Sequence, residues 1–365
     1  MTTTPLASTM HVVACAEGGT TRLEVRPVPA VAAGEMLLRL RCCGLCGTDL
    51  FKLATGLAPP GGVLGHELVG NVVATGDDVM DFSTDDRVVV AHHVACGKCA
   101  LCRRGNETLC SVFRENLLEP GGFSEYVLVR ERAVRQAAFR IPDSISDAAA
   151  VFVEPAACVL RGLRHSGLGR VDKNADPPGT AVILGGGSMG LLHLLVLRAW
   201  RPDLCIVLCD PLAPRRALAE RLGAHATYSP DEVDAGKQAV DTLTDGLGAD
   251  VVFDTVGGRS VLRSALTLLR EGGSALLFAH APQGDHADFD LNDLFKHERL
   301  VRGTYSGGRR DQQETFELIA SGRLDAVSLV THTLPLSRFA DGVDLTRRHE
   351  ALKVLFVTDE AAGDA

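Results

Sequence analysis

The sequence predicts an α/β protein of two domains, one rich in β-strands and one built on a doubly wound parallel sheet. Between residues 11 and 140, short runs rich in Val and Leu alternate with turn signals, as in MLLRLRC (36–42) and RVVVAHH (87–93). From Thr180 onward, apolar strands alternate with segments of helical length, which is the order of a doubly wound sheet. A chain of 365 residues is also long enough for about two cores.

The elements of the second domain can be named in order. TAVIL (180–184) is an apolar strand that runs into GGGSMG, and GLLHLLVLRAW continues as a helix. CIVLCD (205–210) is a second buried strand, followed by the helix-like PRRALAERLGA. ADVVFDTVGG (249–258) and SALLFAH (274–280) are further strands, with a helix at 260–270 between them. Before this domain, the segment containing VEPAAC is helical, and its proline predicts a break or kink.

Composition limits the class of protein. Apolar residues make up 46% and charged residues 23%, which is typical of a globular protein, and no apolar run approaches the roughly 18 residues of a membrane span. MTTTPLASTM has no basic start and apolar middle, so no secretory signal is expected. A net charge of −9 argues against a nucleic-acid-binding surface. The eleven cysteines are bunched, which favours metal binding in a reducing cytoplasm over a disulfide scaffold.

The stretch CGKCALCRRGNETLC places four sulfurs close together in the chain. They belong to Cys96, Cys99, Cys102 and Cys110. This spacing suits a tetrahedral zinc site, while an iron–sulfur cluster and free thiols on a loop are the alternatives. Because four protein ligands leave no position for a substrate, this metal would be structural. Any chemistry must therefore be sought elsewhere.

A second, open metal site is predicted from the motifs CCGLCGTD and GHELVG. Cys46, His66 and a carboxylate would leave room for a water or alcohol oxygen. Glu67 and Glu154 compete for the place of the carboxylate. The alternative for CGLC is a dithiol redox motif that uses Cys43 and Cys46.

The motif G-x-G-x-x-G in GGGSMG predicts a dinucleotide site, because it follows a strand and opens a helix. The turn that would approach the pyrophosphate contains Gly185, Gly187, Ser188, Met189 and Gly190. Asp210 ends the next strand, where a carboxylate can accept a hydrogen bond from a ribose 2′-hydroxyl and repel a 2′-phosphate. NAD is therefore predicted over NADP. Arg215 could soften that preference, and a plain turn role for Asp210 before a proline stays open.

These motifs together resemble one family. CGLCGTD, GHE, the four-cysteine loop, GGFSEYV, VEPAAC and GGGSMG occur in the order seen in zinc-dependent medium-chain alcohol dehydrogenases, over nearly the whole chain. VEP makes the chain most similar to the branch of sorbitol, threonine and related polyol dehydrogenases. The resemblance implies a GroES-like catalytic domain at 1–155, a Rossmann NAD-binding domain at 156–305, and a return to the catalytic domain at 306–365.

The resemblance also implies roles for single residues. Cys46 matches the family's zinc-binding cysteine, His66 and Glu67 match its GHE, and Glu154 matches its glutamate before proline. Members of the family differ over which glutamate touches the metal. We expect Glu154 in the inner or near shell and keep Glu67 as a candidate ligand.

Further roles carried by the resemblance lie around this group. Asp49 resembles the carboxylate that orients the histidine ligand, and Thr48 resembles the hydroxyl that passes the substrate proton toward solvent. Phe51 stands where some members have a relay histidine, so the outer relay must use another group. Lys353 matches a basic residue that meets the pyrophosphate, and a solvated strand lysine is the alternative. His92 and His93 are expected to be structural or solvated.

The function implied is a zinc enzyme with NAD and two zinc ions per chain, one catalytic and one structural. It would transfer a hydride between a secondary alcohol, such as a polyol, a sugar or an amino alcohol, and NAD, giving the ketone. The alternatives are a primary-alcohol or aldehyde dehydrogenase of the same family, and a non-catalytic zinc protein that senses NAD. A homodimer or homotetramer is expected by analogy, joined through the sheet edge at 300–306. The expected partner is a small alcohol or ketone, with no nucleic acid and no membrane.

Overall fold

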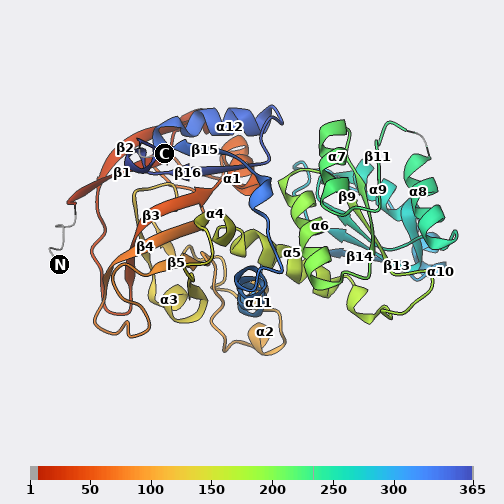
Figure 1. The fold of residues 1–365 in the computed structure, drawn as a ribbon, viewed down its shortest axis with the longest axis horizontal. Helices are drawn as coiled ribbons and strands as arrows, with labels where there is room; N and C mark the ends of the chain where they lie inside the picture. Colours follow the sequence, from red (N-terminus) through yellow and green to blue (C-terminus); the bar gives the residue numbers. More distant parts are fainter. Residues whose placement is uncertain (1–6, 233, 364–365) are drawn as a thin grey trace. The chain divides into compact units, whose positions relative to one another are not determined.

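The computed structural model describes residues 7–232 and 234–363 and forms two compact units (Figure 1). Unit 1 comprises Met1–Pro155 and Gly308–Ala365, and unit 2 comprises Ala156–Gly307. The second boundary thus falls after Gly307 rather than after residue 305. The ends of the predicted catalytic domain, residues 1–6 and 364–365, lie outside the described residues.

Unit 1 is built around an eight-stranded sheet whose main path runs in the order β15-β16-β3-β4-β5-β8, with β7 joining β3 and β6 joining β7. Its strands are β3 (Met36–Gly44), β4 (Glu67–Thr75), β5 (Arg87–Val90), β6 (Leu118–Glu119), β7 (Tyr126–Val129), β8 (Ala138–Arg140), β15 (Val330–Pro335) and β16 (Lys353–Val357). A separate antiparallel pair consists of β1 (Thr9–Cys15) and β2 (Thr21–Pro27). The helices of this part are α1 (Gly47–Thr55), α2 (Ala100–Arg103), α3 (Glu131–Ala137), α4 (Asp147–Ala150), α11 (Arg309–Ala320), α12 (Phe339–Arg347) and α13 (Asp359–Gly363).

The register of three strands decides what comes together at one end of this sheet. β3 and β4 are antiparallel, so the last residue of β3, Gly44, lies opposite the first residue of β4, Glu67. β16 pairs antiparallel with the same end of β3, with Leu355 opposite Gly44. The C-terminal segment therefore enters the sheet beside the two sequence motifs that were predicted to bind a metal.

The core of unit 1 contains a cluster of three phenylalanines from distant segments. Ring centroids are 4.7 Å apart for Phe123 and Phe339, 4.8 Å for Phe339 and Phe356, and 5.5 Å for Phe123 and Phe356. Phe123 and Phe356 are fully buried. Aromatic pairs at such separations add to the free energy gained from burying their apolar area, so this cluster fastens the C-terminal segment to the N-terminal one.

Unit 2 is a parallel six-stranded sheet in the order β11-β10-β9-β12-β13-β14. Its elements are β9 (Thr180–Leu184), α6 (Ser188–Trp200), β10 (Cys205–Cys209), α7 (Ala213–Arg221), β11 (Ala226–Tyr228), α8 (Ala235–Thr244), β12 (Ala249–Asp254), α9 (Arg259–Leu268), β13 (Leu269–Leu277), α10 (Leu291–Lys296) and β14 (Leu300–Gly303). From β9 the chain adds β10 and β11 on one side of the sheet, and it later adds β12, β13 and β14 on the other side of β9. This is the doubly wound order.

Helices cover both faces of this sheet. Val182 and Val252 pack in one cluster with Leu262 of α9 and Val240 of α8. Phe253, the neighbour of Val252, points to the opposite face and contacts α6. Burial on both faces explains why β9 and β10 are apolar at nearly every position.

The structure confirms the predicted fold class, and it corrects some details. Pro155 does not break the helix, because α5 (Val153–His165) begins just before it, and the first turn does not need the amide proton that proline lacks. β5 ends at Val90, so the two histidines after it lie in a loop. β13 begins at Leu269, earlier than the apolar run indicated. Within the described residues, none of the helices has both the length and the apolar character that crossing a bilayer requires.

Replacing Phe356 with Ala should lower the free energy of unfolding by about 3–5 kcal/mol, since it removes a fully buried ring and leaves a cavity among the remaining phenylalanines. Denaturant unfolding followed by circular dichroism would measure this. Met80→Ala is the control, because Met80 is 87% exposed in the same unit and should change stability by no more than about 0.5 kcal/mol. Equal effects of the two substitutions would contradict the assignment of Phe356 to the core.

Candidate functional site

Three side chains at one end of the unit 1 sheet form a group able to hold a metal ion. One ligand atom each of Cys46, His66 and Glu67 lies within 4.8 Å of the others. Glu67 and His66 are buried, while Cys46 is half-buried. A thiolate, an imidazole and a carboxylate together form a donor set that zinc accepts with a further coordination position open.

Local structure explains why these residues meet. Cys46 follows β3 and is the N-cap residue of α1, where its Sγ accepts a hydrogen bond from the amide of Thr48 at 3.5 Å. His66 and Glu67 lie at the start of β4, which is the strand opposite the end of β3. A short helix and an antiparallel register therefore bring the CGLCGTD and GHE motifs together.

Asp49 ties the two motifs to each other. It is fully buried, and its carboxylate accepts hydrogen bonds from the amides of Cys46, at 3.1 Å, and Gly65, at 3.4 Å. Its Oδ1 also lies 3.4 Å from Nδ1 of His66. Holding that nitrogen leaves Nε2 of the ring to face a metal, which fixes both the tautomer and the direction of the imidazole.

The charges of this group determine the protonation of its members. Burial lowers the pKa of His66, but the charges of Asp49 and Cys46 outweigh burial and raise that pKa well above its usual value. Burial raises the pKa of Asp49, but the nearby His66 outweighs it and lowers the pKa. The site is therefore rich in negative charge and favours a cation.

Lys353 lies within this group. Its side chain is buried, its Nζ lies 2.7 Å from Glu67 Oε2, and it also donates to the carbonyl oxygen of Leu45 at 3.2 Å. Burial lowers the pKa of Lys353, but Glu67 and Cys46 outweigh burial and raise it, so the ammonium stays charged. This placement contradicts a solvated strand lysine, because the side chain is buried and both bonds are made to residues beside the metal group. The expected contact with the pyrophosphate stays a prediction.

One carboxylate oxygen of Glu67 is placed as a metal ligand would be. Oε2 is bonded to Lys353, but the other oxygen, Oε1, is buried without a hydrogen-bond partner among the described residues. A buried carboxylate oxygen left unpaired costs free energy unless another cation binds it. The three donors therefore fit zinc, with Glu67 as the carboxylate that the structure brings to Cys46 and His66.

Glu154 lies outside this three-donor group. It is 5% exposed, near the start of α5, and its Oε1 lies 3.7 Å from Nδ1 of His92. His92 in turn lies beside His66, since the centroids of the two rings are 4.7 Å apart. Glu154 is therefore close to a residue that lies next to the metal group. The structure thus puts Glu154 at the edge of the site.

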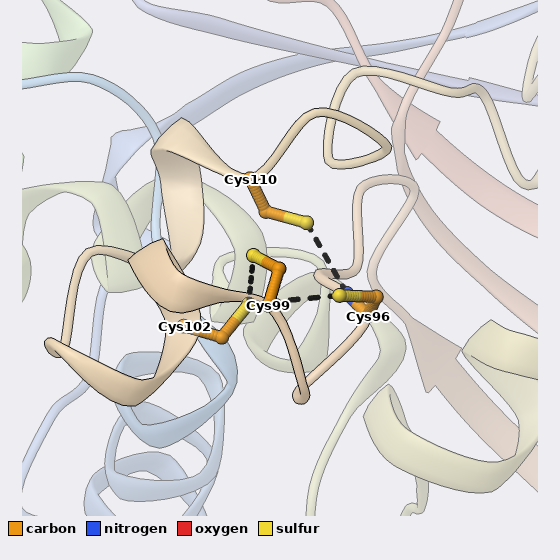
Figure 2. A group of neighbouring side chains, drawn as sticks. All are labelled: Cys96, Cys99, Cys102 and Cys110. Carbon is orange, nitrogen blue, oxygen red and sulfur yellow. Dashed lines mark hydrogen bonds between the residues drawn. The ribbon is translucent and has the colours of Figure 1, made fainter.

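The four-cysteine loop forms a second metal-binding group, drawn in Figure 2. Sγ of Cys102 lies 3.5 Å from that of Cys99 and 3.9 Å from that of Cys96, while the amide of Cys96 donates to Cys110 Sγ at 3.5 Å. Four sulfurs around a zinc ion at about 2.3 Å would lie about 3.8 Å apart. The cluster thus has nearly the dimensions of a zinc tetrathiolate site.

Short turns hold these sulfurs. Cys99 is the N-cap of α2, Cys102 lies within that helix, and Cys110 follows a 3₁₀ turn at Glu107–Leu109. Amide groups of Lys98 and Cys99 lower the pKa of Cys96 to about 6, which favours a thiolate there. Burial raises the pKa of Cys102 to about 12, and hydrogen bonding with Cys99 adds to this. A bound cation would supply the positive charge that the other three thiolates need.

Unit 2 contains the predicted dinucleotide turn. Gly185 has φ +103°, and a Cβ on Gly190 would lie 1.7 Å from the carbonyl oxygen of Gly185, so glycine is required at both positions. α6 begins at Ser188 without a side-chain cap, and the Ser188 hydroxyl is buried without a hydrogen-bond partner among the described residues. A helix N-terminus without a side-chain cap, with a hydroxyl that has no partner in the described part of the chain, fits a phosphate group.

Asp210 lies at the end of β10, as predicted, and also supports this turn. Its carboxylate accepts hydrogen bonds from the amides of Gly186, at 2.7 Å, and Leu212, at 2.8 Å. Nη1 of Arg215 lies 3.8 Å from Oδ2 of the same carboxylate. The acidic group and the basic group that were expected to act on the cofactor are therefore neighbours.

Family models match both units. A model described as alcohol dehydrogenase GroES-like domain matches residues 32–143, and one described as zinc-binding dehydrogenase matches residues 175–321.

Three similar proteins agree with these matches. D-altritol 5-dehydrogenase of Agrobacterium fabrum is 31% identical over 333 residues, covering 90% of this chain and 93% of that protein. Sorbitol dehydrogenase of Bacillus subtilis is 29% identical over 353 residues, covering 92% and 93%. A structure from Sinorhizobium meliloti 1021, described as a zinc-binding dehydrogenase bound to NADP, has a TM-score of 0.83 and 28% identity, covering 96% of this chain and all of that one.

The chain belongs to the zinc-dependent medium-chain alcohol dehydrogenases, and it is similar to the polyol dehydrogenases among them. The family resemblance expected from the motifs is thereby confirmed. The protein is an enzyme of the dehydrogenase class.

Two features of the site did not follow from the sequence. The Glu67–Lys353 pair joins residues 286 positions apart, and a lysine in a β-strand gives no sign of burial. The place of His92 beside His66 was also missed. The only signal was a histidine pair directly after a strand that ends close to the metal motifs.

Replacing Cys102 with Ser should remove one of two zinc ions per chain and lower the Tm, because three remaining thiols bind zinc more weakly than four. Metal content by plasma emission spectroscopy and thermal unfolding would measure both effects. Cys205→Ser is the matched control, since Cys205 is a buried cysteine outside both metal groups and should keep the metal. Retention of both ions in the Cys102 variant, or iron in place of zinc, would refute the assignment.

Replacing Gly190 with Ala should weaken NAD binding by more than tenfold, because the added methyl group cannot coexist with the present position of the Gly185 carbonyl. Isothermal titration with NADH would measure the affinity. Gly169→Ala is the control, because its methyl group would make an ordinary contact with Trp200 at 3.6 Å. Unchanged affinity in the Gly190 variant would show that the turn does not hold the cofactor.

Proposed function

We propose that this enzyme oxidises a secondary alcohol, of the polyol, sugar or amino-alcohol type, to the ketone with NAD, and that it also catalyses the reverse reaction. The observation that carries this proposal is the group of Cys46, His66 and Glu67, with an oriented histidine and a carboxylate oxygen that has no hydrogen-bond partner in the described part of the chain. Zinc bound there would act as a Lewis acid that lowers the pKa of a substrate hydroxyl.

The residues around this group have separate tasks in the proposal. Asp49 would orient Nε2 of His66 toward a bound ion, because it holds the other nitrogen of the ring. Lys353 offsets the charge of Glu67, so that a thiolate and a carboxylate can be buried side by side. Thr48 lies in the first turn of α1, two residues from Cys46, and its hydroxyl would receive the substrate proton.

The preference for NAD over NADP rests on Asp210. A carboxylate at the end of β10 would accept a hydrogen bond from the ribose 2′-hydroxyl and repel a phosphate at that position. Arg215 is its neighbour, and the similar structure from Sinorhizobium meliloti is bound to NADP. The preference must therefore be measured with both cofactors.

The substrate class is supported by the relatives named above. One acts on D-altritol and another on sorbitol, both of which carry hydroxyl groups on adjacent carbons. We therefore propose a polyol as the first substrate class to test. A small alcohol or ketone would be the partner of the site in either direction.

The assembly and the compartment are also proposals. β14 is an edge strand of the unit 2 sheet, and Leu300 and Tyr305, at and just after it, are 47% and 40% exposed. An exposed edge with apolar side chains can pair with its own copy, which supports a homodimer or homotetramer. The eleven cysteines all lie among the described residues and none of them is in a disulfide, which supports a reducing compartment such as the cytoplasm.

The activity test uses purified zinc-loaded enzyme with NAD or NADP and a panel of alcohols, followed by nicotinamide absorbance. Secondary polyols such as sorbitol and altritol should reduce NAD faster than ethanol does, and NAD should exceed NADP in kcat/KM. Cys46→Ser should lower kcat by at least a hundredfold, because an alcohol ligand replaces the thiolate. Circular dichroism would show that this variant is folded.

The controls separate the alternatives. Cys43→Ser is matched, since Cys43 is buried outside the metal group and should keep most of the activity. Equal loss in both variants would favour a dithiol motif. Faster turnover of primary alcohols would replace the secondary-alcohol proposal, and NAD binding without turnover of any alcohol would favour a sensor.

A further inference from the structure

A histidine that has no task in the proposed mechanism lies beside the metal group. His92 is in the loop after β5, and its side chain is 12% exposed. Its ring centroid is 4.7 Å from that of His66, and its Nδ1 lies 3.7 Å from Oε1 of Glu154. Nδ1 is fully buried and has no hydrogen-bond partner among the described residues. A buried nitrogen of this kind loses its bond to water without a replacement, which is a cost unless a ligand supplies one.

The imidazole of His92 and the carboxylate of Glu154 form a pair of neighbouring polar groups. A neutral imidazole has one nitrogen that donates and one that accepts a hydrogen bond. Glu154 adds a carboxylate oxygen beside it. Together they offer a donor or acceptor nitrogen next to an acceptor oxygen.

The separation of these two atoms suits a hydroxyl group between them. At 3.7 Å they are too far apart for a direct hydrogen bond. An oxygen atom about 2.8 Å from each could accept from the imidazole N–H and donate to the carboxylate. Because the ring of His92 lies 4.7 Å from that of the candidate ligand His66, such a hydroxyl would be held beside the metal group.

We propose that His92 and Glu154 bind the hydroxyl on the carbon next to the reacting carbinol, so that the site selects substrates with hydroxyl groups on adjacent carbons. This rests on the proposed secondary-alcohol activity and adds a specificity-determining residue to it. His92 is not among the three donors that lie within 4.8 Å of one another, and the proposal assigns it to the substrate. His93 is a contrast, since its ring packs between that of His92, at 3.7 Å, and that of Phe113, at 5.4 Å, a residue packed with the four-cysteine group.

The experiment compares 2,3-butanediol with 2-butanol, which differ by the adjacent hydroxyl only. In His92→Phe, the ratio of kcat/KM for the diol to that for 2-butanol should fall by about tenfold or more, because the ring of Phe cannot bond a hydroxyl. The change should appear mainly in KM for the diol. His92→Asn keeps a polar atom near the position of Nδ1 and should restore part of the ratio.

Two further measurements do not depend on turnover. Calorimetric titration of the enzyme–NADH complex with the diol should show a weaker affinity in His92→Phe, by a factor similar to that in KM. Zinc content should stay at the wild-type value, which separates substrate binding from metal binding. His93→Phe is the control, because it keeps an aromatic ring against His92, 3.7 Å away, and it should leave the ratio of the two substrates unchanged.

Several outcomes would overturn the inference. These are an equal loss for both alcohols, a loss of zinc in His92→Phe, an unchanged ratio, or a change caused by His93→Phe instead. If wild-type enzyme oxidises neither secondary alcohol nor any polyol, the proposed function fails. If it oxidises both and the ratio does not depend on His92, only the inference fails.

Discussion

The buried ion pair between Glu67 and Lys353 is the interaction on which the catalytic part of this protein depends. It joins the strand that follows the GHE motif to a strand near the C-terminus, within a sheet where both strands flank the end of β3. Removing one partner of such a pair would leave an uncompensated buried charge, which costs about 3–5 kcal/mol. The same pair occupies one oxygen of Glu67, while the other has no hydrogen-bond partner among the residues that the structure describes. Charge balance in the core and availability of a metal ligand are thus set by one lysine.

The site could be predicted where its residues are close in sequence or carry a characteristic spacing. The four-cysteine loop, the dinucleotide turn and the meeting of Cys46 with His66 follow from motifs whose residue types are dictated by their chemistry. Lys353 could not be placed in this way, because its burial is caused by a strand pairing across nearly the whole chain. The choice between Glu67 and Glu154 likewise depends on register and not on spacing.

The fold, like the site, was predictable in some parts and not in others. The parallel sheet was predictable because strands buried on both faces are apolar at nearly every position. The ends of strands were less predictable where the apolar pattern continues beyond the last residue that is hydrogen-bonded to a neighbouring strand. An example is β5, which ends at Val90 although the apolar run continues. Pro155 was misinterpreted because a proline disrupts a helix interior but is tolerated in the first turn, and the sequence does not reveal where that turn begins.

The hydrogen bonds made by Asp210 have a consequence for redesign of the cofactor preference. This carboxylate fastens the glycine turn through the amide of Gly186, so it is part of the phosphate-binding loop as well as a candidate contact for ribose. Exchanging it for a neutral side chain to admit a phosphorylated ribose would also loosen the loop that has to grip the pyrophosphate. An engineered change of coenzyme would therefore need a second residue to fasten that loop.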